Sequence, residues 1–169
     1  TGMDTYIHSV EAITGTKKNT FAEAYSEKSL EMCREVFLRM DRKDVKSDEF
    51  LMVASYMGGL SLTYSEVGVC HALSYGLGKI LEIHHCIANC IAFDKLEDVY
   101  GDYVQEFKGM VAHNKVHIPQ GLAKDWSDET ISAMAEVAYN LPHMWDHAFG
   151  PDWQKVLDRE RIKGWYRRM

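Results

Sequence analysis

The stretch Gly68–Cys90, GVCHALSYGLGKILEIHHCIANC, decides the fold and the chemistry expected of this chain. It consists mostly of apolar and small residues, with one lysine and one glutamate, and it holds three of the eight histidines, His71, His84 and His85. Its glycines lower helix propensity and allow close backbone approach, so we predict a helix, a glycine-rich turn and a second helix that begins near His84. This geometry could point His71 and His85 at one place. Alternatively, the histidines are partly exposed or hydrogen-bonded residues of a helical core.

The overall composition is that of one compact domain. The 169 residues are 46% hydrophobic, and the net charge of −6 comes without a basic stripe, so binding to nucleic acid or to an anionic membrane is not expected. No uncharged run reaches the roughly 20 apolar residues that span a bilayer, and the N-terminus lacks a signal pattern. We therefore expect a soluble, cytoplasmic protein.

The four cysteines, Cys33, Cys70, Cys86 and Cys90, lack the spacing of a disulfide scaffold. Reduced and partly buried thiols are the expected state. Cys86 and Cys90 are one helical turn apart and next to His85, which leaves a thiolate metal site as an alternative.

The start of the chain predicts a helix from Met3 to about Thr14, because apolar residues recur there at intervals of three and four. Asp4 and His8 are one turn apart on this helix, so both could reach one divalent cation. The alternative is a simple pair on the helix surface. The chain begins without methionine and almost directly in this helix, and we therefore expect a piece of a longer protein.

Helices are also predicted for the rest of the chain. A capping box of Thr20 and Glu23 opens a second helix that ends near Met40 and has Phe21 among its core positions. A third helix, capped by Ser47 or Asp48, contains the pair Gly58 and Gly59, which indicates tight packing against another helix. Further helices are predicted over residues 87–100, 102–113, 128–139 and 152–168, with a short helical turn from residue 142.

No segment shows the alternation of a β-strand, so the predicted architecture is all-α. The four tryptophans crowd the last third of the chain, where core packing is the expected role: Trp126, Trp145, Trp153 and Trp165.

Asp4, His8, His71 and His85 would together form a set of three imidazoles and one carboxylate. This set suits Fe(II) or Zn(II) and can keep a position open for a substrate oxygen, which is typical of a Lewis-acid site. Two alternatives stay open. The same ligands could serve a hydrolase or lyase that acts through metal-bound water, or the histidines could be structural in a non-catalytic helical module.

Two segments resemble motifs of the iron-containing (group III) alcohol dehydrogenases. TGMDTYIHSVEA resembles their TGMDxxxHxxE segment, and GVCHALSYGLGKILEIHHCIAN resembles their GxxHxxxHxxGxxxxxxHGxxN segment, with the same interval between His71 and His85. The resemblance implies that residues 1–169 form that family's multi-helix C-terminal domain (a dehydroquinate synthase-like α domain). It also implies the metal ligands, which fall on Asp4, His8, His71 and His85.

The resemblance further implies oxidation of a small-molecule alcohol or sugar with NAD(P), and a homodimer is possible. In that family an N-terminal α/β domain chiefly binds the nicotinamide cofactor, and no Gly-rich phosphate loop follows a strand in this sequence. We therefore expect that the nucleotide-binding domain is missing from this chain and that the chain does not turn over alone.

The sequence departs from the family pattern at three positions, one of which is His84 in place of a frequent proline. Tyr75 replaces a histidine that lies beside the substrate and is often assigned a part in proton transfer, so Tyr75 is a candidate catalytic residue that could donate a hydrogen bond or a proton; the alternative is that it only packs. Cys86 replaces a glycine. Within the family, ASYMGG, CHALSYGLG and ANCIAF look most like the branch that oxidises the C8 hydroxyl of 3-deoxy-D-manno-octulosonate.

Overall fold

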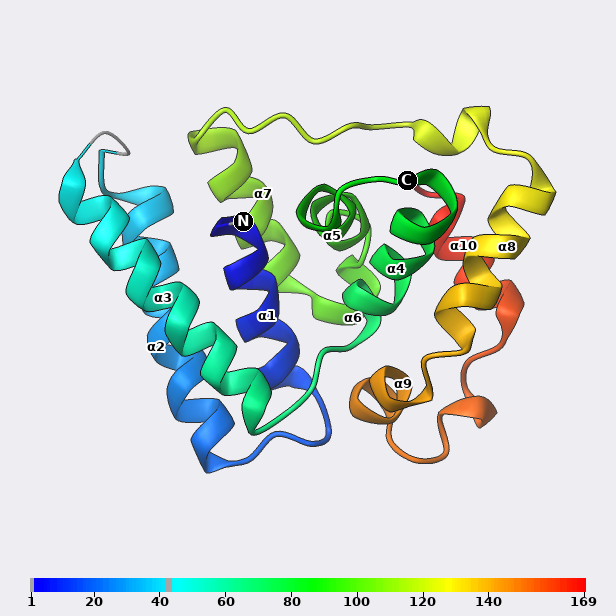
Figure 1. Ribbon diagram of the computed structural model, residues 1–169, viewed down its shortest axis with the longest axis horizontal. Helices are drawn as coiled ribbons and strands as arrows, with labels where there is room; N and C mark the ends of the chain where they lie inside the picture. Colours follow the sequence, from blue (N-terminus) through cyan, green and yellow to red (C-terminus); the bar gives the residue numbers. More distant parts are fainter. Residues whose placement is uncertain (1, 42–43) are drawn as a thin grey trace.

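The computed structural model describes residues 2–41 and 44–169, and every regular element in these residues is a helix (Figure 1). The all-α prediction is confirmed. No helix among the described residues combines the length and the apolar character needed to cross a membrane. The helices are α1 (Gly2–Thr14), α2 (Thr20–Leu38), α3 (Val45–Thr63), α4 (Val69–Leu81), α5 (His85–Phe93), α6 (Glu97–Tyr100), α7 (Asp102–His113), α8 (Asp128–Tyr139), α9 (Pro142–Phe149) and α10 (Arg159–Tyr166), with 3₁₀ helices η1 (Leu122–Asp125) and η2 (Trp153–Lys155).

Helix α1 lies in the middle of the fold, between the α2–α3 pair and the helices α4 and α5 (Figure 1). Its apolar face is fully buried at Tyr6, Ile7 and Val10. Because neighbours cover several of its sides, Asp4 and Glu11 are buried as well. The first helix of the chain therefore carries carboxylates into the interior.

The predicted glycine-rich turn is wrong, because Gly76 and Gly78 lie inside α4. The helix ends instead at Glu82, which has a left-handed backbone with φ of 55°. Gly76 serves close packing: a Cβ there would lie 2.0 Å from the Tyr166 hydroxyl oxygen and 2.8 Å from the Met134 carbonyl oxygen. The glycine thus lets α4 pack tightly against α8 and α10.

Two predicted helix caps are also wrong. Asn19, not the Thr20–Glu23 box, caps α2, since its side chain accepts hydrogen bonds from two backbone amides of the first turn. Asp44 caps α3, which therefore begins a few residues before the predicted cap at Ser47 or Asp48. The starts of both helices were displaced because a short Asx side chain was available just upstream.

Side-chain placement on α2 and α3 follows the predictions only in part. Phe21 is 62% exposed, outside the core, and stacks on Tyr64 with ring centroids 5.1 Å apart. Gly58 is packed, because an added Cβ would lie 3.2 Å from the Ser29 hydroxyl oxygen, whereas Gly59 has nothing within 4 Å.

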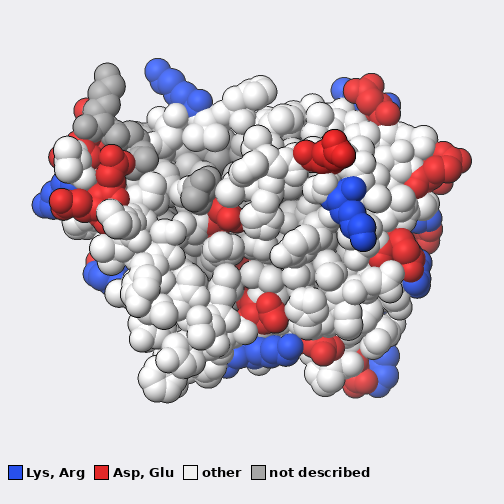
Figure 2. All heavy atoms as spheres, in the orientation of Figure 1, with Lys and Arg blue, Asp and Glu red and all other residues white. Residues whose placement is uncertain are grey.

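Charged side chains on the face shown in Figure 2 lie mostly toward its edges.

The later helices match the sequence more closely. The predicted range 102–113 and the Ser127 cap of α8 are confirmed. The range 87–100 is interrupted between α5 and α6, and the final helix begins at Arg159 rather than near residue 152, with Asp158 as its cap. Three tryptophans are buried, at positions 145, 153 and 165, while Trp126 is only partly buried.

Candidate metal centre

The four predicted ligands come together at the junction of α1, α4 and α5. Asp4 and His8 lie on α1, His71 lies in the first turns of α4, and His85 opens α5. One donor atom from each lies within 4.8 Å of the others. Asp4 Oδ1 is 3.7 Å from His8 Nε2 and 3.8 Å from His71 Nε2, and Asp4 Oδ2 is 3.8 Å from His85 Nε2.

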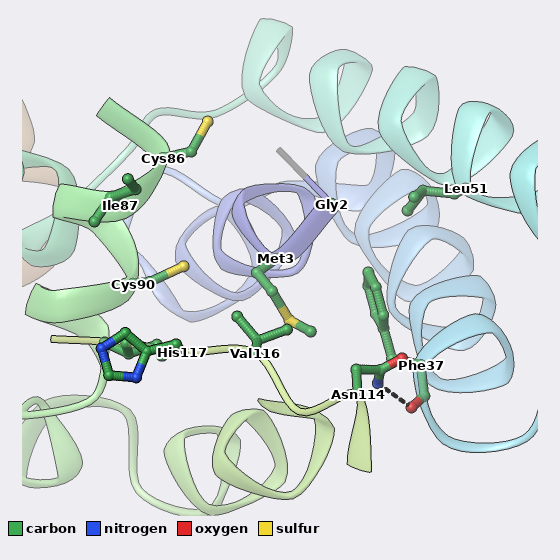
Figure 3. A pocket seen from close by; sticks show the side chains of 11 residues that line it. Gly2, Met3, Phe37, Leu51, Cys86, Ile87, Cys90, Asn114, Val116 and His117 are labelled. Atoms are coloured by element: carbon green, nitrogen blue, oxygen red, sulfur yellow. Dashed lines mark hydrogen bonds between the residues drawn. The ribbon is translucent and has the colours of Figure 1, made fainter. Parts of the chain in front are cut away.

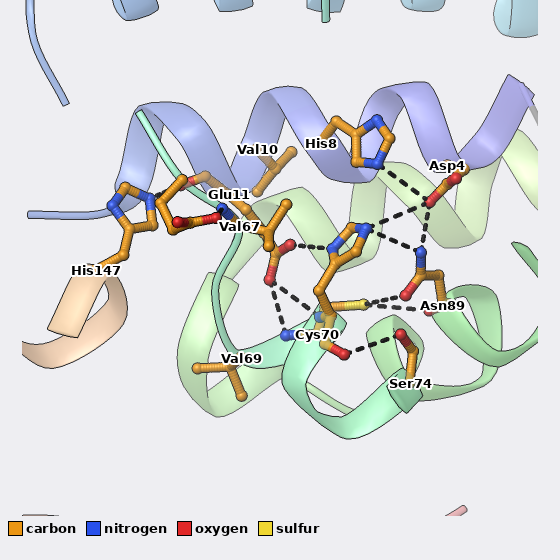
Figure 4. A network of polar contacts seen from close by, with 12 residues as sticks. Asp4, His8, Val10, Glu11, Val67, Val69, Cys70, Ser74, Asn89 and His147 are labelled. Atoms are coloured by element: carbon orange, nitrogen blue, oxygen red, sulfur yellow. Dashed lines mark hydrogen bonds and ion pairs between the residues drawn. The ribbon is translucent and has the colours of Figure 1, made fainter. Parts of the chain in front are cut away.

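Glu11 fixes the orientation of His71, a role that the sequence analysis missed. The Glu11 carboxylate, labelled in Figure 4, is 1% exposed. Its Oε2 accepts a hydrogen bond from His71 Nδ1. Its Oε1 accepts from the Cys70 backbone N–H at 2.8 Å and from the Tyr100 hydroxyl at 2.7 Å. With Nδ1 as the donor to Glu11, the other ring nitrogen of His71, Nε2, faces Asp4 and the cluster.

Asn89 is the second residue that the sequence analysis missed. Its side-chain nitrogen lies 2.6 Å from Asp4 Oδ1, 3.0 Å from His71 Nε2 and 3.2 Å from His85 Nε2, and the residue is fully buried. Donor atoms of three predicted ligands therefore face a single point. Both missed residues were present in the quoted motifs, as the final E of TGMDxxxHxxE and the final N of the second motif.

The environment of the imidazoles determines their charge. Burial lowers the pKa of His8 and of His85, so both are neutral near pH 7 and have lone pairs available for a metal. Burial alone would also lower the pKa of His71, but the adjacent Glu11 carboxylate raises it above its ordinary value. Conversely, burial alone would raise the pKa of Glu11, and His71 lowers it.

Tyr75 lies on the open side of this cluster. It is 44% exposed, and its ring centroid is 6.0 Å from that of His85, whose side chain is 43% exposed. His8, by comparison, is stacked against His71 with ring centroids 4.9 Å apart. The cluster is therefore reached from solvent past His85 and Tyr75.

A separate cavity of about 430 Å³ lies near the start of α1 and is mostly apolar (Figure 3). Cys86 and Cys90 line it. No cluster of metal-binding groups in residues 2–41 and 44–169 contains both thiols, so these residues do not assemble the alternative thiolate site. Burial raises the pKa of Cys90 to about 12, and all four cysteines are free thiols, as expected. Cys86 instead lies beside the centre, with Sγ 3.6 Å from Asp4 Oδ2.

Comparisons with known proteins give a consistent result. The family model described as "Fe-containing alcohol dehydrogenase family, C-terminal" matches residues 1–138. The chain is 24% identical over 144 residues to the NADPH-dependent butanol dehydrogenase of Clostridium saccharobutylicum, covering 83% of this chain and 35% of that protein. It is 28% identical over 102 residues to the 4-hydroxybutyrate dehydrogenase of Clostridium kluyveri, covering 58% of this chain and 28% of that protein.

Solved structures share the fold. The iron-containing alcohol dehydrogenase of Thermococcus thioreducens superposes with a TM-score of 0.73 at 20% identity, over 98% of this chain and 48% of that one. A 1,3-propanediol oxidoreductase gives a TM-score of 0.74 at 18% identity, over 99% of this chain and 50% of that one. The chain thus spans about half the length of these structures and about a third of the length of the first curated relatives it matches.

Proposed function

This chain belongs to the Fe-containing alcohol dehydrogenase family, whose C-terminal region it matches, and from this premise we propose that it is the metal-binding part of an NAD(P)-dependent alcohol dehydrogenase. The observation that carries the proposal is the convergence of Asp4, His8, His71 and His85. Fold similarity alone would not carry it, because one fold hosts many functions.

The donor set fits a divalent metal ion. Three imidazole nitrogens and one carboxylate are ligands that Fe(II) and Zn(II) both accept. The side-chain nitrogen of Asn89 contacts Asp4 Oδ1, His71 Nε2 and His85 Nε2 at once, which supports a common point for these three atoms. When bound there, such an ion would supply Lewis-acid chemistry toward the substrate hydroxyl.

Other roles at the site, in orientation, charge and substrate contact, fall to different side chains of this chain. Glu11 holds the His71 ring with Nε2 toward the cluster, and Asp4 supplies the negative charge beside all three imidazoles. The exposed edge at His85 admits the substrate next to Tyr75. We assign to the Tyr75 hydroxyl a hydrogen bond to the substrate oxygen and the relay of its proton, in which Tyr75 takes up the substrate proton as it releases its own to the solvent that it faces.

Oxidation of an alcohol also needs a hydride acceptor, for which we propose NAD(P). Residues 2–41 and 44–169 contain no strand followed by a Gly-rich phosphate loop. We therefore propose that a nucleotide-binding domain outside this sequence binds the cofactor and that the chain alone does not turn over.

The proposed substrate is a small alcohol or a sugar hydroxyl. The names of the butanol and 4-hydroxybutyrate dehydrogenases support the first class. The segments ASYMGG, CHALSYGLG and ANCIAF support a specific candidate, the C8 hydroxyl of 3-deoxy-D-manno-octulosonate.

Metal binding tests the proposal directly. After exhaustive dialysis against a chelator, the chain should bind one Zn(II) and melt at a higher temperature in its presence. His71→Ala should lose this binding, whereas His113→Ala, an exposed histidine at the end of α7, should retain it. A chain that binds no divalent ion and melts unchanged with Zn(II) would remove the metal site.

A catalytic assay tests the proposal that the nicotinamide cofactor is bound by a domain outside this sequence. The isolated, zinc-loaded chain should give no steady formation of NAD(P)H from butanol. Steady turnover would contradict the proposal that the cofactor is bound elsewhere. Release of product from an ester without nicotinamide would instead favour a hydrolase.

A further inference from the structure

A groove lies between α4 and α8. It measures about 610 Å³. Tyr75 lines this groove, and its ring centroid is 6.0 Å from that of His85, so Tyr75 is common to the groove and to the exposed edge of the metal centre. Its lining combines polar and charged groups with small or aliphatic ones: Tyr75, Lys79, Ala133, Glu136, Val137, Asn140 and Leu141.

Glu136, the one acidic residue among these lining residues, forms an ion pair with Arg159, which does not line the groove. Glu136 accepts two hydrogen bonds from Arg159, at 2.5 Å from Nε and 3.0 Å from Nη2, and a third from Asn140 at 2.9 Å. The Arg159 guanidinium holds the pKa of Glu136 at about 2. Glu136 therefore stays ionised, and the charge of Arg159 offsets its own.

Lys79 supplies the remaining charge of the groove. It lies one helical turn after Tyr75 on α4 and is exposed. Within residues 2–41 and 44–169, no carboxylate lies within ion-pair distance of its ammonium group. Its positive charge is thus available to a ligand in the groove.

We propose that this groove binds the acid group of the substrate, which is an alcohol that carries a carboxylate several carbons from its hydroxyl. This inference rests on the proposed function. The hydroxyl lies at the metal centre, the carbon chain passes Tyr75 and the aliphatic wall at Val137 and Leu141, and the carboxylate pairs with Lys79.

The spacing limits the substrate's length. Tyr75 and Lys79 are four residues apart, which is about 6 Å along the helix axis. A substrate that reaches from the metal centre past Tyr75 to Lys79 therefore carries its carboxylate several carbons from its hydroxyl. We therefore expect the groove to prefer a hydroxy acid of this length to a neutral alcohol of the same length.

The test compares 6-hydroxyhexanoate with its neutral counterpart 1,6-hexanediol on the zinc-loaded chain, by NMR titration. The acid should bind about fivefold more tightly at low ionic strength, and the preference should shrink as salt is added. Lys79→Met should abolish the preference, Lys79→Arg should keep it and Lys79→Glu should reverse it. Lys124→Met, an exposed lysine outside the groove, should leave it unchanged.

The outcomes separate this inference from the proposed function, because zinc content is measured in the same samples. If zinc binds but the wild-type chain does not distinguish the two ligands, or if Lys79→Met retains the preference, the inference is wrong and the metal site stands. If no zinc binds, both are wrong. Circular dichroism and zinc stoichiometry equal to wild type confirm that each variant is folded.

Discussion

Replacing Glu11 by glutamine (E11Q) should weaken Zn(II) binding about 10- to 100-fold, the loss expected when the partner that orients a ligating histidine is removed. Glu11 accepts the hydrogen bond from His71 Nδ1 and thereby directs Nε2 at the other ligands. A glutamine has nearly the same shape but no charge. The glutamine therefore no longer fixes which nitrogen of the His71 ring carries the proton.

The same substitution should destabilise the fold. Four groups donate to the Glu11 carboxylate: His71 Nδ1, the backbone N–H groups of Cys70 and His71, and the Tyr100 hydroxyl. Glutamine keeps only one acceptor oxygen and turns an amide group toward the remaining donors. Removing one partner of a buried ion pair costs about 3–5 kcal/mol, which corresponds to a fall in melting temperature of about 6–20 °C for a chain of this size.

Calorimetry measures both effects: thermal unfolding without metal gives the stability, and competition with a chelator gives the Zn(II) affinity. Glu27→Gln is the matched control, since Glu27 is exposed on α2. An E11Q chain that melts lower but binds Zn(II) as tightly as wild type would show that Glu11 is a structural residue and does not orient the ligand.

Three further perturbations have definite outcomes. Burial alone would raise the pKa of Glu106, but the Arg34 guanidinium lowers it below its ordinary value. The Arg34–Glu106 ion pair therefore stabilises the fold fully above about pH 4.3, and this stabilisation is lost as the pH falls through the lowered pKa of Glu106. Glu106→Gln should accordingly cost about 1 kcal/mol at pH 7 in urea unfolding, and a cost that persists at pH 2 would contradict the ion pair. Gly76→Ala should destabilise by about 1–3 kcal/mol, while Gly59→Ala, with open space around it, should be neutral or stabilise by up to about 1 kcal/mol; equal melting temperatures would refute the packing role of Gly76. In an enzyme completed by its nucleotide-binding domain, Tyr75→Phe should lower kcat about 100-fold with zinc content unchanged, and an unaltered kcat would leave Tyr75 a packing residue.

Much of the fold was predictable because apolar residues repeat at helical intervals. The apolar residues that recur from Met3 onward predicted α1, and with it the shared face on which Asp4 and His8 lie. Ser127 marked the start of α8 because its hydroxyl accepts from the Thr130 backbone N–H. These signals are local, so a single sequence carries them.

Tertiary contacts decided the features that the sequence did not reveal. Gly76 reads as a helix breaker until Tyr166, ninety residues later, packs against it. Glu11 and Asn89 are the last residues of the two family motifs, but no local signal gives their roles, although Glu11 is three residues after His8 and so shares its face of α1. Their roles follow from burial beside His71, and burial of that kind depends on how distant helices meet.

The central claim is that one divalent ion binds where α1, α4 and α5 meet, and anomalous scattering at the zinc absorption edge from crystals of the zinc-loaded chain tests it most directly. We predict one strong peak about 2.0–2.2 Å from Nε2 of His8, His71 and His85 and from a carboxylate oxygen of Asp4. A peak at Cys86 and Cys90 instead, or no peak at all, would contradict the account.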